Sequence, residues 1–525
     1  MAAPVTRDPR LPPLPSTRRR LWAQRLSLSA LSFLVTALLL EALVRRLGVP
    51  GAPVLLREGL YASQLPMVTG RDNAPYVAGS PLPETKRRGE IRVFVFGESS
   101  VEGLPWGYGG SPPAMLRDHL RALSPQADFT VVNMGRSAST MMDAYYYLVS
   151  IEAYAPDVVV FYQGSNDLFH TDRERCAPAL HPRAYSAYRW LVERSRLLWA
   201  ARALGPRVYT RIFPPTSRPP PHAFGEDRQP GDLCDPAQAF PAWTEILLST
   251  AKGLGARIIV TTPVENPLRW ADENTRSQPA PSEPYRRLLS CALGDDCDLV
   301  ATWKAVRGAP SFAWDRLGPR RRAWIAAAEA HGARVVDFAG YLEREAEGGL
   351  RPPLFAEEVH LSLEGYWRLS WLWATEIRAL VEDRPSAGLA APPPPLLDER
   401  FYLSEAARYG SRGSAACTLL RSGALHLRLN MRVLAASLLE SAVNIDAPPA
   451  GEAASSRVGA AAQLLLAWLR RDAGVDPRLP SSLAAALDGL DVARLTEELQ
   501  RHADCSSLPG APPGPGAAAS AGSSP

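Results

Sequence analysis

The sequence has little that would suit nucleic acid or metal ions. Its 58 Lys and Arg residues nearly balance its 54 Asp and Glu residues, and a net charge of +4 is too mild to indicate a nucleic-acid partner. The eight histidines are scattered, and no pair has a metal-ligand spacing such as His-x-x-x-His. The glycine-rich stretch 107–110 lacks the Gly-Lys-Ser/Thr ending of a phosphate-binding loop.

Cysteine is also sparse, with six residues in 525: Cys176, Cys234, Cys291, Cys297, Cys417 and Cys505. Paired cysteines would suit an oxidising compartment. Cys291 and Cys297 could close a short loop, and Cys176 and Cys234 could staple a longer insertion. The sequence leaves this connectivity open, and free buried thiols are the alternative.

One apolar run, residues 26–44, covers about the thickness of a bilayer's hydrocarbon core, and only Glu41 interrupts it. Six arginines precede the run: Arg7, Arg10, Arg18, Arg19, Arg20 and Arg25. The positive-inside rule therefore places residues 1–25 in the cytoplasm. A cleaved signal peptide is the rival, but Arg45-Arg46 replaces the small-residue cleavage site. We predict a single-pass anchor in the inner (cytoplasmic) membrane, with the remainder on the periplasmic or extracytoplasmic side.

Composition divides the exported part. Residues 45–87 are rich in Pro, Gly and charge and form a linker, and residues 88–385 are expected to form the main domain. Its regular pattern lapses at about 170–236, which predicts an insertion that acts as a lid or substrate-facing cap. The rest divides into a Pro-rich linker at 386–399, a helical domain at 400–502 and a disordered tail at 503–525.

Short apolar strands alternate with helical stretches through the main domain. The predicted strands are 91–96, 129–133, 156–162, 256–262 and 333–338, and the predicted helices are 112–123, 141–154, 237–253, 318–331 and the stretch ending at about 382. This alternation is typical of a mainly parallel sheet with helices on both faces. The fold class is therefore α/β, a three-layer α/β/α domain.

Four polar clusters each follow a predicted strand: Ser99, Asn133-Met-Gly135, Gly164-Ser-Asn166-Asp167 and Glu357-Glu358-Val-His360. A doubly wound sheet gathers such clusters along one edge. A hydrolase that works by nucleophilic attack needs a serine, a base, an orienting acid and donors for the oxyanion. The clusters contain a candidate for each of these roles.

We expect Ser99 to attack and His360 to act as the base. Glu357 would hold the other nitrogen of the imidazole, with Glu358 as its competitor. The expected oxyanion donors are the backbone N–H of Ser99, the backbone N–H of Gly135 and the side-chain amide of Asn166.

These four blocks, in this order, resemble those of the SGNH or GDSL hydrolases, which are serine esterases and acyltransferases. The resemblance covers about 90–382, and it implies a flavodoxin-like three-layer fold, the same roles for Ser99, Gly135, Asn166 and His360, and no required metal or organic cofactor. Two departures stand out. The usual Gly-Asp-Ser is Gly-Glu-Ser here, and the usual Asp-x-x-His is Glu-x-x-His.

The sequence therefore predicts an exported, membrane-anchored serine esterase that acts on an acyl ester of a carbohydrate or lipid. By analogy with exported members of such families, O-acetyl groups on a carbohydrate are the first candidate substrate. An O-acyltransferase that modifies an envelope or secreted polysaccharide is the alternative, and it would use the same candidate residues. An inactive scaffold, whose C-terminal helical domain binds a protein partner, is the alternative from another class, and the complete set of candidate residues argues against it.

Overall fold

The computed structural model describes residues 16–47, 76–77, 80–104, 106, 109–137, 139–168, 173–198, 236–266, 283–292, 301–302, 318–345, 354–356, 359–385, 415–428, 432–446, 457–472, 487 and 490–501. By its contacts the chain divides into two compact units. One contains residues 1–58 and 183–222, and the other contains residues 59–182 and 223–525. The predicted linkers at 45–87 and 386–399 fall largely or wholly outside the described residues, and the tail at 503–525 does so entirely.

A five-stranded parallel sheet forms the centre of the larger unit, in the order β4-β3-β5-β6-β7. Its strands are β3 (Glu90–Gly97), β4 (Asp128–Gly135), β5 (Val158–Tyr162), β6 (Arg257–Thr261) and β7 (Arg334–Val336). A two-residue antiparallel pair, β1 (Tyr76–Val77) and β2 (Ser80–Pro81), precedes it. The order reverses around β3, and open α/β sheets bind their ligands at the carboxyl ends of the strands at such a point.

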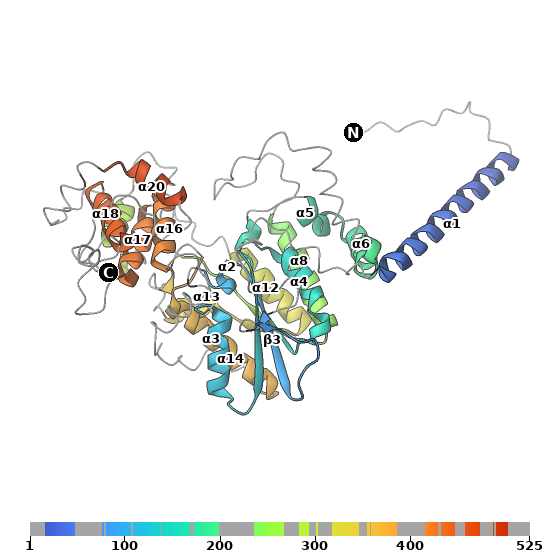
Figure 1. Cartoon of the computed structure of the whole chain (residues 1–525), viewed down its shortest axis with the longest axis horizontal. Helices are drawn as coiled ribbons and strands as arrows, with labels where there is room; N and C mark the ends of the chain where they lie inside the picture. Colours follow the sequence, from blue (N-terminus) through green and yellow to red (C-terminus); the bar gives the residue numbers. More distant parts are fainter. Residues whose placement is uncertain are drawn as a thin grey trace, which may run out of the picture. The chain divides into compact units, whose positions relative to one another are not determined.

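Helices cover both faces of this sheet (Figure 1). On one face α3 (Pro112–Leu123) packs against α14 (Leu363–Val381). On the other face α8 (Pro236–Gly253) packs against α4 (Met141–Ser150) and α12 (Gly318–His331). The shorter helices of this unit include α2 (Ser99–Glu102), η2 (Glu152–Tyr154), η3 (Asn166–Leu168), α5 (Arg173–Leu180), α10 (Glu283–Ala292) and α13 (Phe338–Glu345). The predicted three-layer α/β/α fold is confirmed.

The strand sequences explain this layering. Side chains alternate across a strand, so Val93 and Val95 of β3 join the cluster that includes α3 and α14. Phe96 packs on Phe161 of β5, which itself stacks on Trp324 of α12, with ring centroids 5.5 and 6.1 Å apart. Both faces of β3 are buried, as a continuous apolar run in a parallel sheet requires.

The helix predicted over 141–154 is shorter in the structure. α4 ends at Ser150, and the chain continues as the short 3-10 helix η2. Ala155 then adopts a left-handed conformation with φ of 47°, and Pro156 follows it. A residue before proline disfavours the helical region, so the helical pattern could not continue to that point in one piece.

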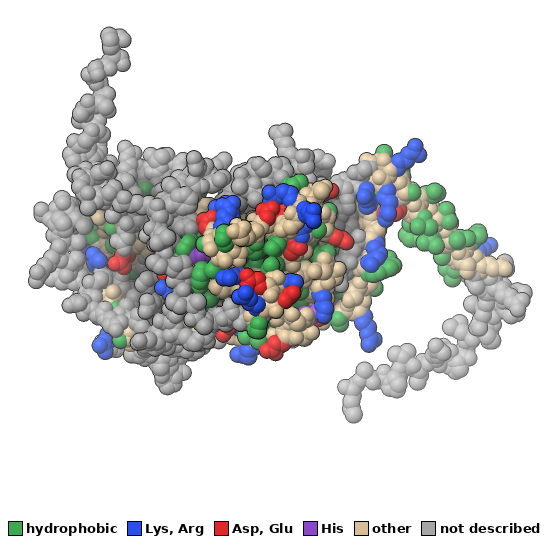
Figure 2. Space-filling model, turned by 90° about the horizontal axis from the view of Figure 1, so that it is seen from below, with side chains coloured by type: hydrophobic (Ala, Val, Ile, Leu, Met, Phe, Trp, Pro, Cys, Tyr) green, Lys and Arg blue, Asp and Glu red, His purple; other side chains and the backbone are tan. Residues whose placement is uncertain are grey.

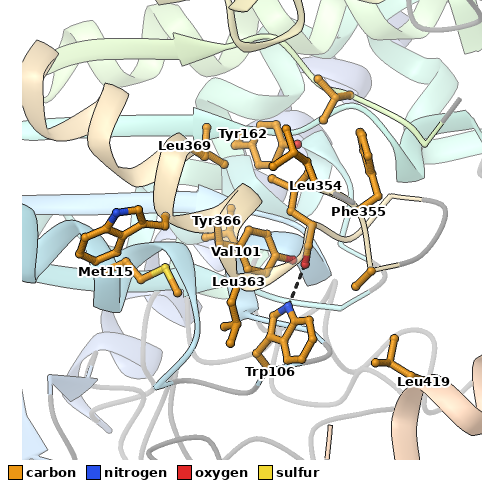
Figure 3. Close-up of a cluster of buried hydrophobic side chains, with 14 of the residues drawn as sticks. Val101, Trp106, Met115, Tyr162, Leu354, Phe355, Leu363, Tyr366, Leu369 and Leu419 are labelled. Atoms are coloured by element: carbon orange, nitrogen blue, oxygen red, sulfur yellow. Dashed lines mark hydrogen bonds between the residues drawn. The ribbon is translucent and has the colours of Figure 1, made fainter. Parts of the chain in front are cut away.

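The described residues beyond 414 are helical apart from Leu490 and Asp491, and the prediction of a helical C-terminal region is confirmed. They form α16 (Ala415–Arg428), α17 (Arg432–Asp446), α18 (Arg457–Asp472) and α20 (Val492–Arg501). Their buried side chains, such as Leu419, belong to the same cluster as Leu354 and Phe355 of the α/β part (Figure 3). Many of the described apolar side chains of these helices are buried within the chain, and no observation on the described residues supports the predicted protein partner.

The apolar run at 26–44 lies within helix α1 (Ser16–Arg46). Residues Gln24–Arg46 are long and apolar enough to cross a membrane, and this stretch is not buried inside the structure. Figure 2 shows hydrophobic side chains covering the surface of this helix. Those with large exposed fractions include Leu28, Phe33 and Leu39.

The described cysteines, Cys176, Cys291 and Cys417, all take part in disulfide bonds. The partners predicted for the first two, Cys234 and Cys297, lie outside the described residues, so the predicted pairing stays a prediction. Disulfides persist in oxidising compartments, which agrees with an exported chain.

Gly97 lets the helix after β3 approach the sheet closely. A Cβ atom at Gly97 would lie 2.1 Å from the Val101 side chain and 2.7 Å from the Tyr162 carbonyl oxygen. We predict that Gly97→Ala lowers the free energy of unfolding by about 1–3 kcal/mol, because the added methyl overpacks a filled site. Thermal or denaturant unfolding measures this change.

The matched control is Gly253→Ala, at the end of α8, where an added Cβ has nothing within 4 Å. Alanine is the better helix former, so this variant should unfold at the same temperature as the parent chain or higher. Equal midpoints for Gly97→Ala and the parent chain would contradict the close-packing argument.

Candidate active site

The sheet register brings the predicted clusters to one edge. Gly97, the last residue of β3, pairs with Gly135 of β4 on one side and with Tyr162 of β5 on the other. Because the three strands end at the same position in the register, the residues that follow them lie at the same edge of the sheet. Ser99 comes two residues after Gly97 and is the first residue of the short helix α2 (Ser99–Glu102).

Ser99 and His360 meet at this edge. The Nε2 atom of His360 lies 2.6 Å from the Oγ atom of Ser99, within hydrogen-bond reach of a base for its nucleophile. Both residues are only 9% exposed. The two lie 261 positions apart in the chain, so the fold alone brings them together.

A closed loop holds His360. Phe355 and Leu361 form an isolated antiparallel bridge across its base, and the Ala356 N–H donates to the His360 carbonyl oxygen at 2.8 Å. Ser362 then caps the start of α14 by accepting from the Gly365 N–H at 3.2 Å. A loop closed at its base and continued directly by a helix has little freedom to move the imidazole.

Gly365 allows α14 to begin this close to the loop. A Cβ atom at Gly365 would lie 2.3 Å from the Leu354 carbonyl oxygen, a distance that no side chain tolerates. That same oxygen accepts from the Ser362 N–H at 2.9 Å. The glycine and the serine together place the first turn of α14 against the base of the His360 loop.

Side chains also tie the segment after Ser99 to the His360 segment. Each of three hydrogen bonds joins a side chain of one to a carbonyl oxygen of the other: Ser100 Oγ to Val359 (3.1 Å), Trp106 Nε1 to Leu361 (2.8 Å) and Tyr366 OH to Leu104 (2.7 Å). The dashed line in Figure 3 marks the bond made by Trp106. These bonds hold the segments that contain Ser99 and His360 in register.

Asn166 lies in the 3-10 turn η3 (Asn166–Leu168) that follows β5. Its side-chain Nδ2 donates to the Ser139 carbonyl oxygen at 2.9 Å, and its backbone N–H donates to Glu98, the neighbour of Ser99. An amide nitrogen carries two hydrogens, so one remains for an oxyanion.

Glu98 connects the nucleophile to the asparagine turn. Its Oε1 atom accepts from the backbone N–H groups of Gly164 (2.9 Å) and Asn166 (3.0 Å). Burial raises the pKa of the Glu98 carboxyl to about 8, and the charge of Asp167 adds to the rise. The two N–H bonds and the Arg320 cation oppose it. This glutamate therefore holds a proton at neutral pH.

Gly135, a predicted oxyanion donor, is the last residue of β4. Its N–H donates to the Asn133 side-chain oxygen at 2.8 Å, two residues back, while Asn133 Nδ2 donates to the Val101 carbonyl oxygen at 2.9 Å. A Cβ at Gly135 would lie 2.2 Å from the Glu102 nitrogen. The observed need for glycine is thus steric, since α2 passes directly over the end of β4. The Asn-x-Gly spacing allows this local side-chain bond and could have indicated it.

Glu102 is a neighbour of the base that the sequence analysis missed. Burial raises the pKa of its carboxyl, and hydrogen bonds from the Ser137 hydroxyl and N–H, the charge of His360 and the charge of Arg136 oppose that rise. The Ser137 hydroxyl bond is 2.5 Å long. Glu102 follows Ser99 by three residues, a spacing that puts both on one face of a helical turn, and that spacing was the available signal.

Glu357 and Glu358, the predicted acid and its competitor, lie outside the described residues. The orienting acid therefore stays a prediction. Within the described part of the chain, no group of three or more His, Cys, Asp or Glu residues is placed to hold a metal ion.

The fold and these side chains define an α/β protein with a serine–histidine pair at the carboxyl edge of a parallel sheet. No protein-family model and no curated protein matches the chain. It is similar to solved structures that include LAE5, an α/β hydrolase from the metagenome of Lake Arreo in Spain (16% identity, TM-score 0.31, covering 54% of this chain and 94% of that one).

Two further solved structures resemble the chain. One is Axe2, an acetylxylan esterase from Geobacillus stearothermophilus (15% identity, TM-score 0.29, covering 57% of this chain and 95% of that one). Another belongs to the G-D-S-L family and comes from Desulfitobacterium hafniense (15% identity, TM-score 0.27, covering 54% of this chain and 97% of that one). Matches at these identities and TM-scores carry no information on the chemistry of this chain.

The protonated state of Glu98 predicts a pH dependence of stability. Its native pKa of about 8 exceeds the ordinary value of 4.5, so between these pH values the native state binds a proton that the unfolded state has released. Stability is therefore lost as pH rises from about 4.5 to 8. Glu98→Gln keeps an acceptor oxygen and does not titrate. Its unfolding temperature should rise relative to the parent chain from pH 5 to pH 8.

Glu90→Gln is the matched control. Burial opposes the change, but hydrogen bonds from Thr130, the Arg87 N–H and Arg92 lower the pKa of Glu90 to about 2. Its contribution to stability is present above the ordinary pKa of 4.5 and is lost as pH falls from about 4.5 to about 2. The difference between Glu90→Gln and the parent chain should therefore be constant from pH 5 to pH 8. A constant difference for Glu98→Gln as well would contradict the assignment of a protonated Glu98.

Proposed function

We propose that this chain is a serine hydrolase that cleaves an ester through an acyl-serine intermediate. The observation that carries the proposal is the 2.6 Å contact between His360 Nε2 and Ser99 Oγ. A buried base at this distance from a hydroxyl at the carboxyl edge of a parallel sheet has the geometry that nucleophilic catalysis requires.

In the first step Ser99 Oγ attacks the ester carbonyl carbon while His360 Nε2 takes the hydroxyl proton. The oxyanion that forms is proposed to accept hydrogen bonds from the Ser99 N–H and the Asn166 Nδ2. Ser99 begins α2, and the first N–H groups of a helix have no partner within it. The tetrahedral species collapses, the C–O bond to the alcohol breaks, and the imidazolium returns its proton to the leaving oxygen.

In the second step water takes the place of the alcohol. His360 removes a proton from the water, whose oxygen attacks the acyl carbon, and the bond to Ser99 Oγ breaks as the proton passes to it. The products are a carboxylic acid and the free serine. If a sugar hydroxyl takes the place of water, the same residues transfer the acyl group instead, which is the acyltransferase alternative. Mass detection of free acid against acylated sugar separates the two.

Glu98 supports the first step by being neutral. A negative charge next to the nucleophile would repel the developing oxyanion, and the raised pKa of Glu98 removes that charge below about pH 8. Glu98 also holds the backbone of Asn166, so it positions one of the proposed oxyanion donors without touching the substrate.

The proposed location is outside the cytoplasm, with the chain held in the inner membrane by α1. The apolar surface of α1 and the disulfide bonds of Cys176, Cys291 and Cys417 support this location. We propose an O-acyl ester on an envelope or secreted polysaccharide as the substrate, because a site in that compartment faces such polymers.

Removal of either member of the pair tests the proposal. Ser99→Ala and His360→Ala should each lower the release of p-nitrophenol from p-nitrophenyl acetate by at least about 10³-fold. A fluorophosphonate should label the parent chain at Ser99. Matched controls are Ser249→Ala and His331→Ala, which alter a serine and a histidine of α8 and α12 that contact neither Ser99 nor His360. Labelling at another residue, or full turnover by Ser99→Ala, would exclude Ser99 as the nucleophile.

The orienting acid is tested separately. Glu357→Gln should lower kcat/KM by about 10²-fold or more, because the imidazole loses the charge that stabilises its protonated form. Glu358→Gln is the matched control and should leave kcat/KM close to that of the parent chain. The reverse outcome would move the role to Glu358. No effect from either change would leave a Ser–His dyad next to the Glu102 carboxyl.

A further inference from the structure

Glu41, the one charged residue within the apolar run of α1, is bound by a distant segment. Its carboxylate accepts hydrogen bonds from the Ser195 hydroxyl (2.8 Å), the Arg196 N–H (3.1 Å) and the Leu197 N–H (2.9 Å). Arg45 also donates to it at 2.7 Å. An ionisable residue in a membrane helix is costly unless it has such partners, so these contacts explain why the run tolerates it.

The depth of this contact follows from the length of α1. Glu41 lies about 8 Å before the end of the candidate span at Arg46, at 1.5 Å rise per residue. When α1 crosses a bilayer, this depth corresponds to the boundary between acyl chains and headgroups. Residues 195–198 are held at that depth by their bonds to Glu41. Arg45 also donates a hydrogen bond to the carbonyl oxygen of Arg194 at 3.0 Å, and Arg194 is the last residue of the helix that precedes residues 195–198.

That helix, α6 (Pro182–Arg194), exposes large apolar side chains. Tyr188, Trp190 and Leu191 are 43%, 55% and 49% exposed, and Leu198 beyond the helix is 39% exposed. Aromatic residues of this kind concentrate at membrane interfaces. The Arg194 guanidinium lies 4.8 Å from the centre of the Trp190 ring, so a cation that can face phosphate headgroups lies over an aromatic face.

We propose that α6 and residues 195–198 form a second membrane contact, which lies in the headgroup region of the bilayer beside the end of α1. The occupant of this surface is lipid, because its apolar residues are joined to a membrane helix by the hydrogen bonds of Glu41. The inference rests on the membrane anchoring put forward under the proposed function. It replaces the predicted lid or cap for this part of the insertion.

The experiment uses the full chain in vesicles of phosphatidylethanolamine and phosphatidylglycerol. A photo-crosslinking phenylalanine analogue is placed at Trp190, at Phe33 of α1 or at Arg121, an exposed residue of α3. Mass spectrometry after illumination identifies the adduct. We expect lipid adducts at Trp190 and Phe33 and none at Arg121.

Each outcome decides a different point. Lipid adducts at Phe33 without adducts at Trp190 overturn the second contact and leave the anchor intact. No lipid at Phe33 overturns the anchor and the contact together, while hydrolysis of p-nitrophenyl acetate still reports on the active site. A protein–protein adduct at Trp190 would assign the surface to a second copy of the chain or to the chain itself.

Glu41→Ala tests the cause of the placement. Loss of the hydrogen bonds to Ser195, Arg196 and Leu197 should lower the yield of lipid adduct at Trp190 by about tenfold, because several charge-assisted bonds are removed at once. The yield at Phe33 should be unchanged. Equal yields at Trp190 with and without Glu41 would show that the carboxylate does not hold this segment.

Discussion

The close approach of α2 to the ends of β3 and β4 is the constraint on which the active site depends. Gly97 and Gly135, paired in register, leave no room for a Cβ atom, because the Val101 side chain, the Tyr162 carbonyl oxygen and the backbone of Val101 and Glu102 occupy that space. Only with both glycines can a helix begin directly at the sheet edge and present the hydroxyl of Ser99. The base, the asparagine turn and the buried acids are all arranged around that hydroxyl.

Two glutamates near the nucleophile have raised pKa values, and burial is the main cause for each. Glu98 anchors the turn that contains Asn166, and Glu102 accepts from Ser137 and interacts with the charge of His360. Below about pH 8 the neutral form of Glu98 adds no negative charge where an oxyanion would develop. Preorganised N–H groups without an opposing charge are the arrangement that stabilises a transition state most effectively.

Much of the fold could be predicted because its signals are local. The continuous apolar runs of β3 and β5 and the periodic helices between the strands indicate a parallel sheet with little ambiguity. Ser99, Asn166 and His360 could also be picked out from the sequence as candidates, since each follows a strand or precedes a helix, and their roles stay proposals. The acceptor of the Gly135 N–H could not be predicted, because it depends on the conformation of the Asn133 side chain.

The sequence by itself determined most of the strands and helices, the long apolar helix at 26–44 and the residue types at the sheet edge, since these follow from the period and polarity of neighbouring residues. Only the tertiary structure decided that His360 contacts Ser99 and that Glu98 holds the Asn166 turn. It also decided that Glu41 binds a segment more than 150 positions away. Contacts between distant residues depend on how elements pack, and burial, which sets the pKa of each acid, exists only once they have packed.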